Sequence, residues 1–537
     1  MLRCLAIVLV VSACGSSPRQ SGGDAPISHD TPGAPDAMVD AFGGPYDDFP
    51  AAPILDGSTG DVSGLFTGSG ATSGGPCLIE PELGTLFPKN WLRPRFSWVP
   101  NGDENLFELT LQTANETNVL TVYTSASTWT MPDDIWTALS AHIIDQGIFV
   151  RVRGAAYDGT TLVHGPELGA SGSIAIAPAD APGAIVYWTT SNGTKLRGFH
   201  VGDESVTDIV TLADTHSQCI GCHTSTPDGM YVGLSSTQDS GNGDPATLVM
   251  LTADGTVQQP SYLTPSAQTL MARTYQELPS YSVNHYMTGD RVALTEYYGT
   301  NSRYEIMWTD LEATSTTQNT GWGILARTGD TGQSASASFA HTSDTILYVT
   351  ASDSVSGVTV HDGDLATIPY NSRMGGQSTK ISGADTAAYN EYYPTFSPDD
   401  RYVAYNRIAE NENSYNSPDA EVYVIPSAGG DPTRIAANDP VQCGASPRTS
   451  PGVTNSWPKW APAVTDASDG KRYYWLTFSS TRLSPSTGTQ HPQLFVSPVV
   501  DDGSGNLETF PALYLWNQPD DENNHTPAWD NFTIVTQ

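Results

Sequence analysis

The chain has 537 residues, of which 58 are Asp or Glu and 23 are Lys or Arg, so its formal net charge at pH 7 is −35. Such an acidic surface repels phosphate groups, which excludes nucleic acids and anionic lipid head groups as general partners. The same surface suits a soluble, exported protein. Calcium ligands are not predicted, because the sequence lacks an Asp-x-Asp-x-Asp-Gly loop.

The N-terminus has the features of an export signal. A short basic start, Met1-Leu-Arg3, precedes an apolar run over residues 5–11 that is too short to span a bilayer. Val11-Ser-Ala-Cys14 resembles a bacterial lipobox, which implies that residues 1–13 are a signal peptide and that Cys14 receives the lipid. Gly15 then favours the outer membrane, with the protein facing the periplasm or exposed at the cell surface. An ordinary cleaved secretory signal is the alternative; in the lipoprotein interpretation the membrane is contacted through the lipid anchor only.

Two segments are expected to precede the main domain. Residues 14–76 are dominated by Gly, Ser, Pro, Ala and Asp, which predicts a disordered tether. Residues 80–178 contain four runs with strand periodicity, at 95–98, 106–111, 119–123 and 148–153. Phe-Ser-Trp in the first run and Phe-Val-Arg-Val-Arg in the last resemble a fibronectin type III or immunoglobulin-like β-sandwich. This resemblance implies an accessory sandwich domain.

A short phrase recurs six times in the second part of the chain. Each copy combines a short aromatic strand, a turn of the Pro-Asp-Gly type and a second β-branched or aromatic strand. Third and fourth strands follow in several copies. The clear copies begin at Tyr393, Trp457 and Thr526, and the weaker ones lie near Ser225, Thr288 and Thr342. Four antiparallel strands that repeat at about 55 to 67 residues predict the blades of a β-propeller.

These phrases resemble the WD40-like repeats of TolB-type periplasmic propellers over residues 184–537. The last copy supplies only the first strand or two of a blade, and residues 185–190 and 195–201 look like its outer strands. A blade built from both ends of the domain would close the ring and leave no open sheet edge. The predicted fold class is therefore all-β: a six-bladed β-propeller preceded by an immunoglobulin/fibronectin-III-like β-sandwich.

The sharpest chemical signal is Cys219-Ile-Gly-Cys222-His223. This C-x-x-C-H sequence resembles the attachment motif of c-type haem, which implies two thioether bonds to the porphyrin and His223 as an axial ligand of the iron. Three interpretations remain open at this stage: covalent haem c, another metal held by Cys and His, or a simple Cys219–Cys222 disulfide.

The repeat alignment places this motif on the strand that lines the central channel of a propeller. His223 falls in the column of three prolines, Pro394, Pro458 and Pro527. His341 and His525 lie on or near equivalent strands. A metal at one mouth of the channel would therefore have His223, His525 and His341 as candidate ligands, and His525 is the first candidate for a sixth ligand of haem iron.

Four cysteines remain once those of the signal and the lipid site are set aside. If Cys219 and Cys222 act together, Cys77 and Cys443 are left, and secreted proteins seldom leave thiols free. We therefore predict a Cys77–Cys443 disulfide, although the sequence does not distinguish it from the other pairings.

Hydrolase, kinase and dehydrogenase motifs are missing from the sequence, so a non-enzymatic role is favoured without being established. The first functional prediction is a monomeric, outer-membrane-anchored envelope lipoprotein whose propeller binds a protein or an envelope polymer as a scaffold. The alternative is a redox protein that transfers electrons through one covalent haem at the propeller mouth. Trp457, Trp460 and Trp529 could form a sugar platform, but their repeat position predicts blade core.

Overall fold

The computed structural model describes residues 44–57, 60–191, 193–238, 246–299, 302–352, 355–356, 358–443, 449–482 and 491–535. The predicted signal peptide, Cys14 and the first part of the predicted tether lie outside these residues. The chain divides into two units, Met1–Gly44 and Pro45–Gln537, and the fold described below belongs to the second. With 46% strand and 6% helix, the protein is all-β. None of the described helices combines the length and hydrophobicity needed to cross a bilayer.

The N-terminal part of this unit consists of two sheets that share one core. The larger sheet has the order β1 (Ile54–Asp56), β6 (Leu120–Thr124), β5 (Leu106–Gln112), β8 (Gly147–Tyr157), β9 (Leu162–Ile176) and β3 (Leu86–Phe87). The smaller contains β2 (Cys77–Glu80), β4 (Arg95–Val99) and β7 (Thr128–Thr130), and helix α1 (Asp133–His142) follows β7. Phe96 and Trp98 of the smaller sheet pack with Leu109 and Val150 of the larger one in a single buried cluster.

The predicted tether differs from the structure over residues 45–57 and 60–76, which fold onto the larger sheet. Strand β1 pairs in parallel with β6, with Ile54 opposite Val122. Phe49 is fully buried, and Val62 and Phe66 pack with Leu106, Tyr123 and Ala155 of the larger sheet in a small buried cluster. These apolar residues are isolated among Gly, Ser and Asp without strand or helix periodicity, so composition alone predicted a tether where burial of a few side chains is sufficient for folding.

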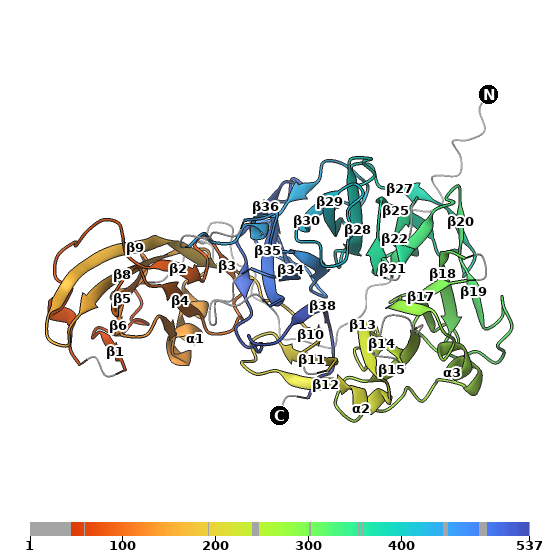
Figure 1. Cartoon of the computed structure of the whole chain (residues 1–537), viewed down its shortest axis with the longest axis horizontal. Helices are drawn as coiled ribbons and strands as arrows, with labels where there is room; N and C mark the ends of the chain where they lie inside the picture. Colours follow the sequence, from red (N-terminus) through yellow and green to blue (C-terminus); the bar gives the residue numbers. More distant parts are fainter. Residues whose placement is uncertain are drawn as a thin grey trace, which may run out of the picture. The chain divides into compact units, whose positions relative to one another are not determined.

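Residues 184–530 form six antiparallel sheets that follow one another around a common centre (Figure 1), a β-propeller-type arrangement. The strands of each sheet are given from the centre outward. The first sheet contains β13 (Cys219–Ser225), β14 (Tyr231–Thr237) and β15 (Thr247–Thr252), and the second contains β16 (Gln276–Tyr281), β17 (Val292–Tyr298), β18 (Tyr304–Asp310) and β19 (Trp322–Ile324). The third contains β21 (Gln333–Phe339), β22 (Thr345–Ala351), β25 (Gly363–Pro369) and β27 (Thr379–Lys380). The fourth sheet contains β28 (Tyr389–Phe396), β29 (Tyr402–Ala409), β30 (Glu421–Pro426) and β31 (Thr433–Arg434). The fifth contains β32 (Ser456–Trp460), β34 (Arg472–Ser480), β35 (Gln493–Asp501) and β36 (Leu507–Thr509). The minor elements are η2 (Ser63–Leu65), α2 (Leu212–Thr215), α3 (Pro265–Met271), β20 (Ala326–Thr328), β23 (Val355–Ser356), β24 (Thr359–Val360), β26 (Gly375–Gln377), η3 (Ala436–Asn438), β33 (Thr465–Asp466) and β37 (Leu513–Tyr514).

The sixth sheet joins the two ends of the domain. It has the order β38 (Asn524–Asp530), β10 (Ala184–Thr189), β11 (Lys195–His200) and β12 (Thr207–Thr211). Ile185 lies opposite Trp529 in the antiparallel ladder, and the Trp529 indole N–H donates to the Pro182 carbonyl at 2.7 Å. The C-terminal strand is therefore the innermost strand of a sheet whose outer strands come from upstream, which is the pairing the sequence predicted.

The recurring phrase corresponds to a recurring turn after the innermost strand. In one copy the Ser397 hydroxyl contacts Asp399 at 2.8 Å and accepts the backbone N–H of Tyr402 at 3.0 Å. The fourth turn residue is left-handed, with φ of 59° at Asp400 and 71° at Gly229. Only Gly, Asn and Asp adopt this conformation at low cost, which explains the Gly and the Asp at the fourth position in these two copies.

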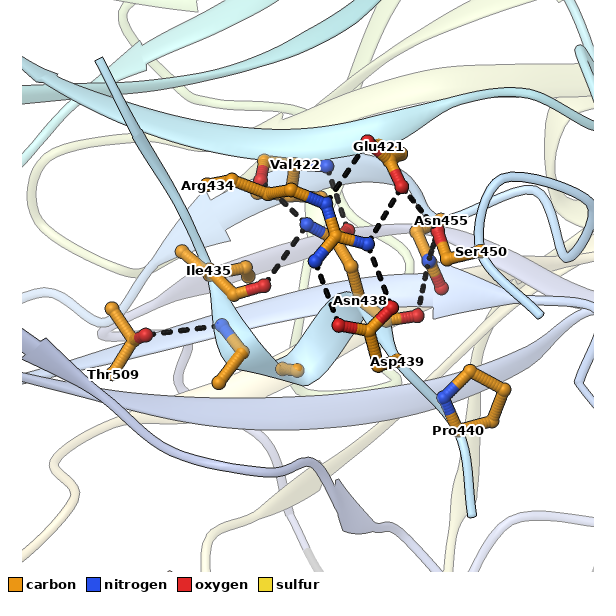
Figure 2. A network of polar contacts seen from close by, with 12 residues as sticks. Glu421, Val422, Arg434, Ile435, Asn438, Asp439, Pro440, Ser450, Asn455 and Thr509 are labelled. Carbon is orange, nitrogen blue, oxygen red and sulfur yellow. Dashed lines mark hydrogen bonds and ion pairs between the residues drawn. The ribbon is translucent and has the colours of Figure 1, made fainter. Parts of the chain in front are cut away.

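A polar network after β31 fixes the segment that links the ring to the N-terminal sheets (Figure 2). The Arg434 guanidinium donates to both Glu421 and Asp439 at 2.7 Å. The Asn438 amide donates to the Val422 carbonyl at 2.8 Å, and its oxygen accepts the Val422 N–H at the same distance. Charge-assisted and bidentate contacts of this kind hold the backbone in one position.

The segment held by this network carries two connections to the N-terminal sheets. Cys443 forms a disulfide with Cys77, with a Cα–Cα distance of 5.8 Å. Nearby, Arg482 and Glu82 form a buried ion pair at 3.1 Å. Burial raises the pKa of Glu82 to about 7, against the opposing effect of Arg482. The pairing of Cys77 with Cys443 is the one predicted for the two cysteines outside the C-x-x-C-H motif.

Candidate functional site in the axial channel

The six innermost strands share a distortion at one level of the channel. In five of them a β-bulge begins with a residue in the left-handed region, at φ between 45° and 60°. These residues are Leu278, Ser336, Tyr393, Trp457 and Thr526. Left-handed conformations of bulky or β-branched residues carry strain, and such strain is often concentrated at ligand sites. The ring of bulges therefore identifies this level as a candidate site.

Strand β13, which carries the C-x-x-C-H sequence, departs from the other five. Its bulge contains Gly221 and Cys222, so it lies one residue earlier in the repeat alignment, and His223 remains in the ladder opposite Leu234. Neither bulge residue is left-handed. The motif thus coincides with the one innermost strand whose bulge is shifted.

Four cavities adjoin along the channel, because neighbouring cavities share lining residues. The first, of 280 Å³, includes His341 and Asp530 near one mouth. The second, of 90 Å³, is the narrow centre and takes two or three consecutive residues from each innermost strand, including His223 and Lys459. The third and fourth, of 170 and 480 Å³, continue toward the other mouth. Trp457 lines the last three and so connects them.

The two thiols of the motif face the third cavity. Cys219 and Cys222 both line it, together with Trp188 and Tyr415, and neither is in a disulfide. Burial raises the pKa of Cys222 to about 12, with a smaller effect of Glu277, so this group is a thiol at neutral pH. A thiol is a weaker nucleophile and metal ligand than a thiolate.

His223 faces a different part of the channel. It lines the first and second cavities but not the third. Its Nε2–H donates to the Val186 carbonyl at 3.0 Å, and its buried Nδ1 has no hydrogen-bond partner among the described residues. Burial lowers the pKa of His223 to about 4, so the imidazole is neutral near pH 7. Cys222 also lines the second cavity beside His223, whereas Cys219 lines the third, so no one of these cavities is lined by all three side chains of the motif.

The other two predicted histidine ligands are also separated. His525 is 6% exposed, packs against Trp188 with ring centroids 4.6 Å apart and lines the fourth cavity, and burial lowers its pKa to about 4. His341 contacts the Asp400 carboxylate at 3.2 Å, and its backbone N–H donates to the same group at 2.8 Å. Within the described ranges, no three His, Cys, Asp or Glu residues are grouped so that they could hold a metal ion. The structure thus does not bring His223, His525 and His341 into one coordination sphere.

The repeat-position tryptophans divide into two kinds. Trp460 and Trp529 are each 4% exposed and belong to buried clusters between sheets, as predicted for blade core. Trp457 is also buried in a core cluster, and it stacks on Tyr393 with ring centroids 3.6 Å apart and planes 12° from parallel. This stacked pair forms one wall of the narrow centre.

Lys459 is the channel residue that the sequence analysis did not single out. It follows Trp457-Pro458 on β32, is half-buried and lines both the first and the second cavity. Burial lowers its pKa. The repeat alignment could have identified it, because the corresponding positions in the other clear copies are the uncharged Thr395 and Ala528.

Comparisons with known proteins identify neither a family nor an activity for this chain. No protein family matches the sequence, and no curated protein matches it. Three solved structures illustrate the similarity. A chain of the nidogen/laminin complex is 9% identical, with 64% of this chain and 98% of that chain covered and a TM-score of 0.34. A Mycobacterium tuberculosis puromycin-hydrolysing peptidase is 10% identical, with 70% and 53% covered and a TM-score of 0.31. An oligogalacturonate lyase in complex with manganese is 8% identical, with 63% and 86% covered and a TM-score of 0.29. This chain therefore spans about half the length of the peptidase.

Proposed function

We propose that the protein is an exported lipoprotein of the outer membrane, anchored through Cys14 and acting as a monomeric binding module of the cell envelope. In this proposal the six sheets are the blades of a TolB-like propeller, and the two N-terminal sheets are an accessory fibronectin-III- or immunoglobulin-like sandwich. The partner is a protein or an envelope polymer, and part of it enters the axial channel. The proposed role is not enzymatic, in keeping with the lack of hydrolase, kinase and dehydrogenase motifs.

One observation supports this proposal most strongly: the narrow centre of the channel contains polar atoms without partners. The hydroxyl oxygens of Ser336, Ser338 and Thr526, and Nδ1 of His223, are buried and form no hydrogen bond within the described part of the chain. Buried polar groups in folded proteins are nearly always hydrogen-bonded. Four such atoms around one cavity, at the level of the strained bulges, favour a site that is completed by a ligand.

The second candidate function is electron transfer through one covalent haem c. It is favoured by the C-x-x-C-H sequence and by the two free thiols that line a common cavity. The arrangement of the three side chains counts against it, since none of the four cavities is lined by Cys219, Cys222 and His223 together. Haem would supply redox chemistry, and attachment would require β13 to repack.

The two candidates are separated by expressing the protein with its own signal in a bacterium that contains the haem-attachment machinery. In the binding proposal, the purified protein has no Soret band, and intact mass after denaturation and alkylation without a reductant accounts for two alkylated thiols at Cys219 and Cys222, because Cys77 and Cys443 remain in their disulfide. A Cys219→Ser/Cys222→Ser double variant is the control and should have the same visible spectrum as the parent. A Soret band that the double variant lacks would overturn the binding proposal in favour of the redox one.

The anchor is tested separately from the ligand. Metabolic labelling with a fatty-acid analogue should modify the parent protein, and a Cys14→Ser variant should be unlabelled and released into the soluble periplasmic fraction. Equal labelling of both proteins, or labelling of neither, would contradict the lipoprotein assignment.

A further inference from the structure

We propose that Lys459 is the anchor of a carboxylate-binding subsite at the narrow centre of the axial channel, and that the ligand of the propeller presents a single carboxylate there. This inference rests on the proposed binding function and specifies the chemistry of its ligand. It follows from four features of the channel: an unpaired cation, a lining free of carboxylates, a collar of hydroxyl groups and a narrow, partly apolar wall.

The first feature is the cation itself. The protein has five lysines and a net charge of −35, so acidic partners are abundant. Three of the lysines form ion pairs, Lys195 with Asp208, Lys380 with Asp364 and Lys471 with Asp469. Lys89 and Lys459 form no ion pair within the described residues, and of these two half-buried lysines Lys459 is the one that lines the channel. A half-buried ammonium group in such an acidic protein, left without a carboxylate, indicates that its counter-charge comes from outside the chain.

The second feature is the composition of the lining. No Asp or Glu lines the 90 Å³ centre. Its other titratable groups are Cys222, a thiol because burial raises its pKa to about 12, and His223, neutral because burial lowers its pKa to about 4. Lys459 is therefore the only lining residue with a formal charge near neutral pH. One uncompensated positive charge in a confined space selects a monoanion.

The third feature is the collar of hydroxyls around the ammonium. Ser336, Ser338 and Thr526 have unpartnered hydroxyl oxygens, and the Ser280 oxygen accepts the Phe339 backbone N–H at 3.2 Å, which leaves its own O–H free to donate. A carboxylate accepts about four hydrogen bonds, so one ammonium group and several hydroxyls match its requirement.

The fourth feature argues against larger anions. The stacked Tyr393 and Trp457 rings narrow the centre, and Asp530 lies in the adjoining 280 Å³ cavity. A phosphate or a dicarboxylate would bring a second negative charge toward this acid without a second cation to compensate it. The site therefore favours the carboxylate of a small organic acid or the C-terminal carboxylate of a peptide, two sources of the same chemical group.

The test uses the whole mature protein with its lysine side chains isotopically labelled. Five lysines give few signals, and the Lys459 signal is assigned by its loss in Lys459→Met. The probes are acetate, propionate, a tripeptide with a free C-terminus, the same tripeptide amidated, and inorganic phosphate. We expect carboxylate probes to shift the Lys459 signal and to raise its apparent pKa, with little effect of phosphate or of the amide.

Variants define which result supports the inference. Lys459→Met should weaken carboxylate binding by about 10- to 100-fold, since hydrogen bonds to charged groups contribute more than neutral ones. Lys459→Arg should retain binding within a few-fold, and the surface control Lys471→Met should leave it unchanged. A stronger response to the free tripeptide than to acetate and propionate would identify a peptide terminus as the source, and the reverse would identify a small acid.

Three outcomes would overturn the inference. These are no shift of the Lys459 signal with any carboxylate, equal binding of phosphate, or equal affinity of the parent and Lys459→Met. If the partner of the envelope still binds the channel in Lys459→Met, the proposed binding function stands and only the carboxylate inference fails. If the protein carries covalent haem, the binding function itself fails, and the separate spectroscopic test detects this.

Discussion

Replacing Trp529 with alanine should lower the free energy of unfolding and also open the ring of sheets where its two ends join. The Trp529 side chain is 4% exposed in the core that contains Ile185, its neighbour in the β10–β38 ladder. Its indole N–H also donates to the Pro182 carbonyl at 2.7 Å. The substitution removes packing and a hydrogen bond at the only described sheet that joins the C-terminal strand to upstream strands.

The magnitude follows from these two contributions. Truncation of a buried Trp to Ala costs about 3–5 kcal/mol in free energy of unfolding. The lost hydrogen bond adds about 1 kcal/mol. Trp529→Ala should therefore lower the free energy of unfolding by about 4–6 kcal/mol. Trp529→Phe, which keeps most of the ring but loses the N–H donor, should lose substantially less.

Trp460→Ala is the matched control. Trp460 occupies the equivalent repeat position, is equally buried, and its indole N–H donates to the Thr395 carbonyl at 3.2 Å. Both variants should show similar shifts in denaturant midpoint. Only Trp529→Ala should make β38 accessible to limited proteolysis. Only this variant should also self-associate through the freed edge of β10, which light scattering would detect. Identical proteolysis patterns and a monomeric state for both variants would refute closure by the C-terminal strand, as would a loss below about 1 kcal/mol for Trp529→Ala.

Four further predictions concern the connection to the N-terminal sheets and the channel thiol. Cys77→Ser/Cys443→Ser should lower the free energy of unfolding by about 2–5 kcal/mol, and reductant should lower the melting temperature of the parent but not of this variant. Arg482→Met should cost about 3–5 kcal/mol because it leaves the Glu82 carboxylate buried without its partner; a chemical denaturation midpoint equal to that of the parent would contradict this. The folded-state pKa of Glu82, about 7, lies above its ordinary value of 4.5, so the folded state binds a proton that the unfolded state has released, and this contribution to stability should be lost as pH rises from about 4.5 to 7. Denaturant midpoints across this range should fall less steeply in Glu82→Gln than in the parent. Alkylation of native Cys222 by iodoacetamide, followed by mass spectrometry, should stay slow at pH 8 because burial raises its pKa to about 12, and rapid labelling of the folded protein would contradict its described burial.

The parts of the fold that sequence predicted are those with a local chemical requirement. The turn phrase is predictable because its fourth residue is left-handed, as at Gly229 and Asp400, and few residues adopt that conformation readily. The pairing of residues 185–190 with the C-terminal strand followed from an incomplete last repeat and unassigned strands upstream, since an open sheet edge is unfavourable.

The parts that sequence did not predict depend on contacts between distant residues. Residues 45–76 read as a tether because Phe49 and Phe66 are isolated in sequence, and their burial depends on a sheet formed by later residues. The bulge in β13 is shifted by one residue, so that Cys219 and His223 line different cavities, and this shift has no signature in the spacing of Cys219 and Cys222. The repeat alignment correctly placed the motif on an innermost strand, but it could not specify which cavity each side chain faces.

The most direct test of the central claim is native mass spectrometry of the protein purified from the envelope of its own cells, compared with the denatured protein. We expect an additional mass in the native spectrum that disappears on denaturation, together with the absence of a Soret band. If the ligand presents a carboxylate at the channel centre, a smaller fraction of the Lys459→Met protein should carry this additional mass. A native mass equal to the polypeptide and its lipid, or an additional mass that survives denaturation and carries a Soret band, would contradict the claim that the axial channel is a non-covalent binding site.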